Sequence, residues 1–442
     1  MSHIAGAGAL LEVAALVQLL TITAGMLAGA VASAIWLKLW RYAVAVSYAA
    51  SIVRSGAAGN LLSTALWHVV QFGPLAIAAV PLLTRKSASM RPIDIGILAC
   101  LALFAFWAFV TAFTGAFRVQ TLAQSALLVL MFGFLALTLS KRWLTSDVIR
   151  QDLTLGFGLI CGAQALGLIG ALTHQPWATA DYGRFEGLFS NANYAGAMSA
   201  IGLMIGLYFI SSQLRNHISW GIAGMLTLGL TLLLSGSRGA LLALVVGLIP
   251  LFRIRASRRV LLLAGGGVVA VGIVLTVMSY LRPSLGGAFN RALQGSDITS
   301  GRLQIYSELL MRWWHMPWFG TGYRTTELLT GPHRLTGHDT YLSVLTETGI
   351  VGAAVFIVLL VLLLRAGPPL RTNRVLLGAV VTVLMVEVTE SFLFGWGSPI
   401  PMFEWLTLLA FVAVGRLSGA AAAWPSGSRS ADPSHRRSII VS

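Results

Sequence analysis

Residues 296–349 read SDITSGRLQIYSELLMRWWHMPWFGTGYRTTELLTGPHRLTGHDTYLSVLTETG, and they form the one long polar segment between runs of apolar residues. The segment holds four arginines, with Arg291 just upstream, and three histidines together with several tryptophans. Such a composition beside long apolar runs predicts a site for an anion at a bilayer surface. We therefore interpret this loop as the functional centre and the apolar runs as its scaffold.

The apolar runs on either side predict a polytopic membrane protein. Of the 442 residues, 57% are hydrophobic and 10% are charged, whereas a soluble chain carries about a quarter of charged residues. Roughly 19–24 apolar-dominated residues, enough to cross a bilayer, occur in each of the segments 62–84, 93–114, 122–140, 192–212, 260–280 and 341–364. The sequence predicts an all-α transmembrane bundle of about 11–13 spans, with one long periplasmic loop containing short helices.

The net charge of +15 is explained by membrane topology rather than by a nucleic-acid partner, because the basic residues fall in short clusters between apolar runs. Alternate clusters place 18 basic residues on one side of the membrane and nine on the other, six of these nine in the long loop. The larger set is Arg85, Lys86, Arg91, Lys141, Arg142, Arg150, Arg215, Arg253, Arg255, Arg258, Arg259, Arg365, Arg371, Arg374, Arg416, Arg429, Arg436 and Arg437. The positive-inside rule puts this set in the cytoplasm and the long loop outside, facing the periplasm or the cell exterior.

The composition divides the chain into five predicted regions. They are an N-terminal membrane segment with one span or three (1–61), transmembrane helices with outward arginine motifs (62–281), the periplasmic loop (282–340), C-terminal transmembrane helices (341–416) and a disordered cytoplasmic tail (417–442). No internal repeat is visible, which disfavours a transporter built from repeated halves.

Two arginines outside the loop fall on the same predicted outer side. Arg184 lies in GRFEGLFSNANYAG, residues 183–196, where Asn191 and Asn193 suit a helix N-cap and can also bind hydroxyl groups. Arg238 lies in SGSRGALLAL, at a turn between two short apolar runs. An arginine in such a place is costly unless it faces water or a partner, so Arg238 is the stronger candidate for function, whereas Arg184 also fits interfacial anchoring.

The loop itself predicts a helix over 301–314, capped by Ser300, with an apolar stripe of Leu303, Tyr306, Leu310 and Trp313 facing the membrane or the bundle. Arg302 lies in the first turn, where the helix dipole disfavours a cation. This placement indicates a nearby anion, either a ligand or the side chain of Asp297.

His338 directly precedes the last long apolar run, in the first turn of a predicted membrane helix. A helix N-terminus favours the neutral imidazole, the form that a general base requires. Asp339 could orient the ring. A purely structural histidine at the interface remains the alternative.

These motifs, in this order, resemble the O-antigen ligase and O-antigen polymerase family of bacterial inner membranes. The resemblance covers about residues 183–405 and includes GRFEGLFSNANYAG, LLLSGSRGALLALVVGL, SGRLQIYSELL, PWFGTGY and HDTYLSVLTETGIVG. The late stretch TESFLFGWGSP, with Glu390 near its start, also looks like the family pattern. Ala192 and Asp339 stand where family members often have Pro and Asn.

The resemblance implies a glycosyl transfer at the periplasmic face, from a glycan on undecaprenyl diphosphate to an acceptor sugar. The acceptor would be lipid A–core for a ligase or another lipid-linked repeat for a polymerase. By this likeness Arg184, Arg238 and Arg302 contact the diphosphate and His338 activates the acceptor hydroxyl, while Asn191, Asn193, Asp339 and Glu390 bind the acceptor or orient other groups.

The residue chemistry fits such a transfer. Arginine binds a diphosphate leaving group better than lysine does, because its planar fork makes bidentate contacts. The reaction needs no metal or other cofactor, and no Asp, Glu and His cluster with ligand spacing is visible. The alternatives are a polymerase of O-antigen, capsule or exopolysaccharide, a transporter of the same lipid-linked glycan, and a structural or sensory membrane protein.

Overall fold

The computed structural model describes residues 83, 89–115, 117–143, 145–179, 184–189, 191–211, 218–251, 302–326, 339–368, 373–394 and 400–422. These residues are helical, without a named strand, and one isolated bridge joins Thr179 to Phe185. The α-helices are α4 (Pro92–Val110), α5 (Arg118–Leu137), α6 (Ser146–Leu172), α7 (Ala192–Ser211), α8 (Ile218–Ser235), α9 (Arg238–Leu248), α12 (Arg302–His315), α14 (Thr340–Ala366), α15 (Arg374–Thr389) and α16 (Ile400–Ala422). Short 3₁₀ turns are η2 (Thr111–Phe113), η4 (Pro176–Ala178) and η7 (Ile249–Leu251), and η3 (Thr138–Arg142) is a π-helical turn.

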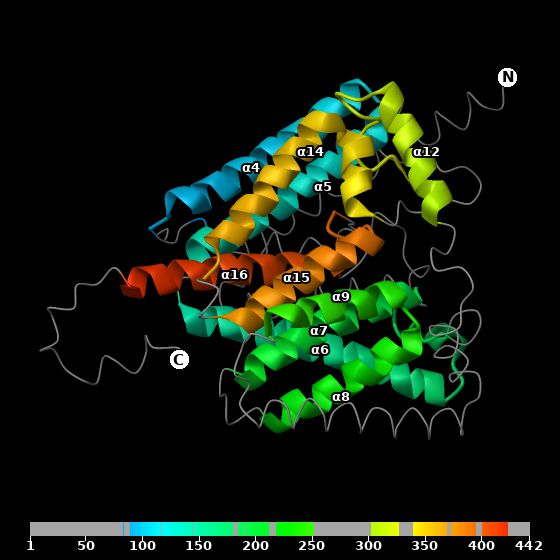
Figure 1. The fold of residues 1–442 in the computed structure, drawn as a ribbon, viewed down its shortest axis with the longest axis vertical. Helices are drawn as coiled ribbons and strands as arrows, with labels where there is room; N and C mark the ends of the chain where they lie inside the picture. The colour runs from blue at the N-terminus through cyan, green and yellow to red at the C-terminus, as the bar shows by residue number, and fades with distance from the viewer. Residues whose placement is uncertain are drawn as a thin grey trace, which may run out of the picture.

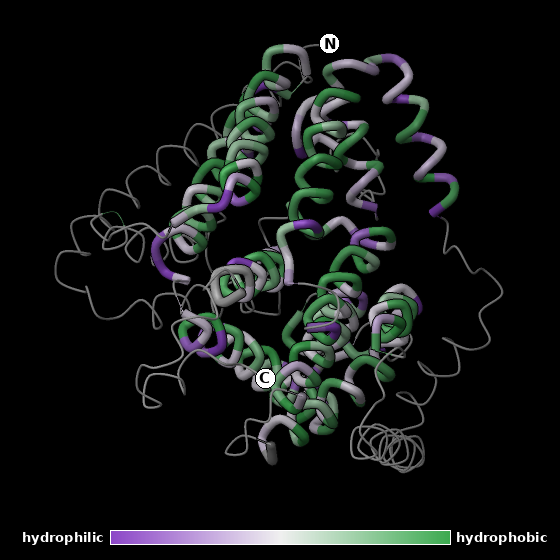
Figure 2. Tube along the Cα trace, turned by 60° about the vertical axis from the view of Figure 1, so that its left-hand side comes forward, coloured by the Kyte–Doolittle hydropathy of each residue, from purple (hydrophilic) through white to green (hydrophobic). Residues whose placement is uncertain are grey.

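The predicted all-α membrane fold is confirmed. Within the described residues, five helical segments are long and apolar enough to cross a membrane: Pro92–Phe113, Arg118–Arg142, Ser146–Leu172, Ala192–Ser211 and Thr340–Ala366. Four of the six predicted spans coincide with these segments. The runs 62–84, apart from Leu83, and 260–280 lie outside the described residues, so the total of 11–13 spans stays a prediction. Figure 2 shows long hydrophobic stretches along the helices.

The helices form two groups with α16 between them (Figure 1). Helix α14 packs against α4, which in turn packs against α5. In the second group α7 packs against α6, α8, α9 and α15, and α15 packs against α9. Helix α16 contacts α14 of the first group as well as α6, α7 and α15 of the second.

Helix α14 is kinked at Gly349, where the backbone takes a φ of 67° that glycine adopts without strain. The loop after α12 docks into this kink. Thr321 donates its backbone N–H to the carbonyl of Thr346 at 2.9 Å, and Ile350 donates to the carbonyl of Pro317 at 2.8 Å. Loop and helix thus satisfy each other's backbone groups, which fixes α12 relative to α14.

Helix α12 covers Arg302–His315, close to the predicted 301–314, while the predicted Ser300 cap lies outside the described residues. The predicted apolar stripe is wrong in detail. Ile305 and Leu309 face the bundle and are buried, whereas Leu303 and Leu310 are exposed. The helix turns about 100° per residue, so these two pairs lie on different faces.

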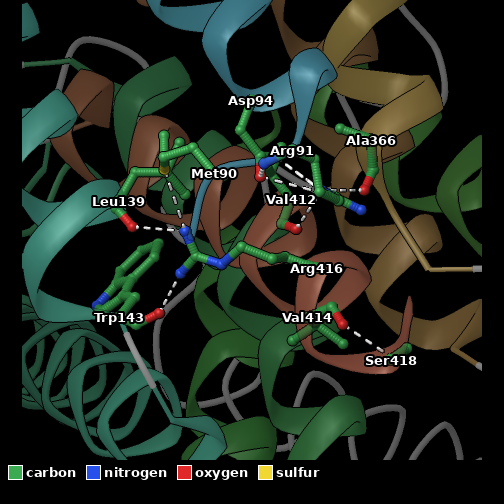
Figure 3. A network of polar contacts seen from close by, with 10 residues as sticks. All are labelled: Met90, Arg91, Asp94, Leu139, Trp143, Ala366, Val412, Val414, Arg416 and Ser418. Atoms are coloured by element: carbon green, nitrogen blue, oxygen red, sulfur yellow. Dashed lines mark hydrogen bonds and ion pairs between the residues drawn. The ribbon is translucent and has the colours of Figure 1, made fainter. Parts of the chain in front are cut away.

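At the far end of α14, away from Thr340, arginines close the bundle (Figure 3). Arg91 pairs with Asp94 at 2.8 Å and donates to the carbonyls of Ala366 and Val412 at 2.9 and 3.2 Å. The helix that begins at Pro92 is therefore tied to the end of α14 and to α16 at Val412.

Arg416 of α16 makes a second tie at the same end. Its guanidinium is buried and donates to the carbonyl of Leu139 at 2.9 Å and to that of Trp143 (Figure 3). These carbonyls end the helical segment of α5 and η3, where backbone acceptors lack partners within the helix. Arg91 and Arg416 both belong to the basic set predicted to lie together in the cytoplasm.

Candidate functional site

Four of the predicted site residues meet in one hydrogen-bonded chain. Arg184 donates from Nη2 to Asn193 Oδ1 at 2.7 Å, and Asn193 donates from Nδ2 to Glu390 Oε1 at 2.8 Å. The same glutamate oxygen accepts from Arg302 Nη2 at 2.6 Å. The four side chains come from the loop before α7, the first turn of α7, the end of α15 and the start of α12. Segments far apart in the sequence thus bring two guanidinium groups to one place.

Arg184 is held against the end of α8. Its Nε donates to the carbonyl of Ser235 at 2.8 Å, and the next residue, Phe185, donates its N–H to the carbonyl of Leu234 at 3.0 Å. The Phe185 ring is fully buried. The carboxyl end of a helix carries partial negative charge, which stabilises a cation there.

The two asparagines act differently. Asn191 precedes α7, and its side chain accepts from the backbone N–H of Asn193 at 2.8 Å, which fits the predicted capping role. Asn193 lies inside the first turn of α7, and its amide bonds to Arg184 and Glu390 instead of capping. An asparagine side chain can accept from one group and donate to another, so Asn193 links a cation to a carboxylate.

Arg238 is the first residue of α9, after the cap residue Ser237. The next residue, Gly239, packs so closely on the last residue of α15 that a Cβ there would lie 2.4 Å from Thr389 Oγ1. The start of α9 is therefore next to the chain segment that carries Glu390. Among the described residues, no hydrogen bond or ion pair engages the Arg238 side chain, which is half-buried.

Asp339 is the cap residue of α14, and its Oδ1 accepts from the N–H of Leu342 at 2.8 Å. Burial raises the pKa of the Asp339 carboxyl. The backbone hydrogen bonds from Leu342 and Tyr341 and the charge of Arg302 act in the opposite direction. The carboxyl is thus within electrostatic reach of Arg302, so the start of α14 adjoins the network.

Tyr306 was not predicted as a site residue, because it was assigned to an apolar stripe. Its hydroxyl is hydrogen-bonded to Arg302, one helical turn earlier in α12. Burial, followed by the charge of Asp339, raises the pKa of Tyr306. The i,i+4 spacing between Arg302 and Tyr306 was the available signal, since such residues are neighbours on a helix surface.

His338 lies outside the described residues, so its predicted role as a base stays a prediction. Arg302 pairs with Glu390, and its alternative partner Asp297 also lies outside the described residues. Within the described part of the chain, no group of three or more His, Cys, Asp or Glu side chains is placed to hold a metal ion.

A model of the family described as O-Antigen ligase (Wzy_C) matches residues 223–357. The match spans most of α8, all of α9 and α12, and α14 from its start at Thr340 to a point past its kink at Gly349. It includes Arg238, Arg302 and Asp339, while Arg184, Asn193 and Glu390 lie outside it. A search of curated proteins found no match. The chain is therefore a helical membrane protein that carries an O-antigen ligase family segment over residues 223–357.

Proposed function

We propose that the protein transfers a glycan from undecaprenyl diphosphate to a sugar hydroxyl at the periplasmic face of a bacterial inner membrane. The observation that carries this proposal is the convergence of Arg184 and Arg302 on Asn193 and Glu390. Arg238 begins the neighbouring helix and adds a third guanidinium without a partner among the described residues. Two arginines at one place, with a third at the start of the neighbouring helix, suit a diphosphate with two to three negative charges.

Glu390 and Asn193 keep the guanidinium groups in place before the donor binds. A carboxylate that accepts from Arg302 mimics one phosphate oxygen, so the arginine need not reorganise when the donor arrives. The diphosphate then takes over contacts from Glu390, and the arginines neutralise the charge that grows on it as the sugar departs.

His338 acts as the general base in this proposal, on the strength of its place in the sequence before α14. The acceptor hydroxyl loses its proton to the imidazole, and its oxygen forms a bond to the anomeric carbon. The bond from that carbon to the phosphate oxygen breaks in the same step. The products are the glycosylated acceptor with inverted configuration and undecaprenyl diphosphate, and no metal takes part in the proposed step.

The acceptor separates two versions of this function. A ligase transfers the glycan to lipid A–core, whereas a polymerase transfers it to another lipid-linked repeat of O-antigen, capsule or exopolysaccharide. A deletion strain distinguishes them. Surface polymer that is made but not attached to lipid A–core indicates a ligase, and single unpolymerised repeats indicate a polymerase.

A purified-protein assay tests the shared chemistry. The full chain in detergent is mixed with a polyprenyl-diphosphate glycan and a core acceptor, and the glycosylated acceptor is measured by mass. We expect transfer by the unmodified chain and by Arg365→Ala, an exposed arginine at the far end of α14. Transfer that survives Arg184→Ala or Arg302→Ala at the full rate would remove that arginine from the site. A transporter of the same glycan would move the donor across vesicles without forming product.

A further inference from the structure

A buried hydrogen bond joins the start of α14 to the end of α15. Thr340, the first residue of α14, is buried, and its hydroxyl donates to Glu387 Oε2. The same oxygen accepts from the backbone N–H of Leu393, in the turn that follows α15, at 2.8 Å. Glu387 is fully buried. One carboxylate oxygen thus ties together two helices and a turn.

This tie lies between the two halves of the proposed site. Thr340 directly follows Asp339, and Glu387 precedes Glu390 by about one helical turn. A second contact lies beside the tie, where the hydroxyls of Ser391 and Ser343 are 3.3 Å apart. The segment that begins α14 at Asp339 and the segment that contains Glu390 therefore meet at Thr340 and Glu387.

A buried carboxyl group is costly, and a leucine of similar size would fill the same space without that cost. Glu404 of α16, equally buried, lies beside Glu387, and among the described residues no cation forms an ion pair with Glu387. Stability alone therefore does not account for Glu387. The two hydrogen bonds that Glu387 accepts, from the Thr340 hydroxyl and the Leu393 N–H, account for it, because they fix backbone segments that carry site residues.

We propose that Thr340 and Glu387 are positioning residues, a latch that holds the start of α14 against the end of α15 at the separation that transfer requires. The inference rests on the proposed function. It assigns no contact with substrate to either residue. Misplacement of reacting groups by about 1 Å costs a reaction on the order of a hundredfold, so a loose latch should slow transfer while leaving donor binding intact.

The first test removes the hydroxyl and keeps the shape. In Thr340→Val we expect kcat for transfer to fall about tenfold to a hundredfold, with the KM for the donor unchanged. Thr340→Ser keeps the hydroxyl donor, and Glu387→Gln keeps an acceptor oxygen. Each of these single variants should therefore retain most of the kcat of the unmodified chain. The matched control is Thr348→Val, because the hydroxyl of this buried threonine donates only one turn back within α14, to the carbonyl of Val344 at 2.7 Å.

The second test measures the latch without relying on activity. The hydroxyls of Ser343 and Ser391 are close enough for Ser343→Cys with Ser391→Cys to form a disulfide on oxidation. We expect this disulfide to form several-fold more slowly when Thr340→Val is added, since the two segments are then less well held. Once formed, the disulfide should restore kcat to the Thr340→Val chain, and reduction should remove the gain.

The outcomes separate the two proposals. No transfer by the unmodified chain with a suitable donor and acceptor refutes the proposed function, while slower disulfide formation in Thr340→Val still supports the latch. An unchanged kcat in Thr340→Val, equal rates of disulfide formation with and without Thr340→Val, or no rescue by the disulfide would overturn the latch. Size-exclusion profiles of all variants confirm that the chains compared are folded.

Discussion

Arg302 and Glu390 are 88 residues apart in the chain, yet 2.6 Å separates the Nη2 of the arginine from the Oε1 of the glutamate. The glutamate side chain is 4% exposed and the arginine side chain 19%. Removal of either partner leaves a charge with little access to water, so a single substitution here changes stability as well as function.

A double substitution separates these two effects. Arg302→Ala should lower the free energy of unfolding by about 1.5–3 kcal/mol, because it strands the Glu390 carboxylate. Arg302→Met combined with Glu390→Gln should recover most of that stability and yet stay inactive, since the donor contact is still missing. Thermal unfolding in detergent and the transfer assay give the two readouts. A double variant that regained activity would show that the pair serves the fold alone.

Arg238 offers the converse case, because no described residue pairs with its side chain. Arg238→Ala should change the free energy of unfolding by less than about 0.5 kcal/mol. Its transfer rate should fall roughly tenfold to over a hundredfold, the effect of losing about 1.5–3 kcal/mol of contact with phosphate. Arg238→Lys should stay well below the unmodified chain, because lysine lacks the planar fork. Full activity of the alanine variant would exclude Arg238 from donor binding.

His338 is tested by a pair of substitutions that differ in hydrogen bonding. General-base assistance is worth about 10²–10⁴-fold, so His338→Ala should lose that much transfer while expression and donor binding stay nearly unchanged. His338→Gln keeps size and hydrogen bonding but cannot take the proton, and we expect it to be equally impaired. If the glutamine variant retains most of the activity, His338 only positions the acceptor. The base would then be sought at Asp339 or at Asp181 and Glu186, the acidic residues that flank Arg184 in the sequence, or judged unnecessary.

We expect the stability of the folded chain to depend on pH through the carboxyl group of Asp339. Burial raises the pKa of this carboxyl, so the folded chain binds the proton more tightly than the unfolded chain. Its contribution to stability is therefore largest below the pKa that Asp339 has in the unfolded chain. This contribution declines as the pH rises through the higher pKa of the folded chain. Asp339→Asn still caps α14 and lacks this titration. The unfolding temperature of the unmodified chain should rise relative to Asp339→Asn as the pH is lowered through this window, and a constant difference would contradict the assignment.

The sidedness of the site is tested by thiol labelling. Gln304 is exposed on α12, and a cysteine there should react with an impermeant reagent in intact spheroplasts. A cysteine at Ser428, in the predicted cytoplasmic tail, should react only after the membrane is opened. The unmodified chain, with Cys100 and Cys161, gives the background. The reverse pattern would place the arginine network in the cytoplasm and exclude a periplasmic transfer.

Much of the fold could be predicted because hydrophobic length and helix signals are local. The spans around α4, α5, α7 and α14 follow from apolar runs, and the end of α12 at His315 follows from the proline two residues later. The side of the membrane assigned to each arginine stays a prediction, and the structure adds which arginines lie together. Arg184 and Arg302 share one network, whereas Arg91 and Arg416 lie together at the other end of α14.

The partners of the site residues could not be predicted, because they depend on which helices are neighbours. Nothing local in the sequence indicates that Asn193 bonds to Glu390 across 197 positions, or that Thr340 bonds to Glu387. Tyr306 was misassigned because a tyrosine on an amphipathic helix fits an apolar stripe as well as a polar contact. The hydrogen bond between Tyr306 and Arg302 can be assigned only once the helices that face α12 are known.

The position of α16 between the two groups of helices bears on how the protein is made. Trp405 of α16 donates to the carbonyl of Leu393, beside the end of α15, and Arg416 closes the opposite end through Leu139. Both contacts come from the last helix that the structure describes. A chain still emerging from the ribosome, with α15 inserted and α16 not yet made, lacks the support that the Leu393 turn receives in the finished bundle. The turn after α15, which lies next to Glu390 in the chain, therefore gains its hydrogen bond from Trp405 only late in synthesis, once α16 has been made.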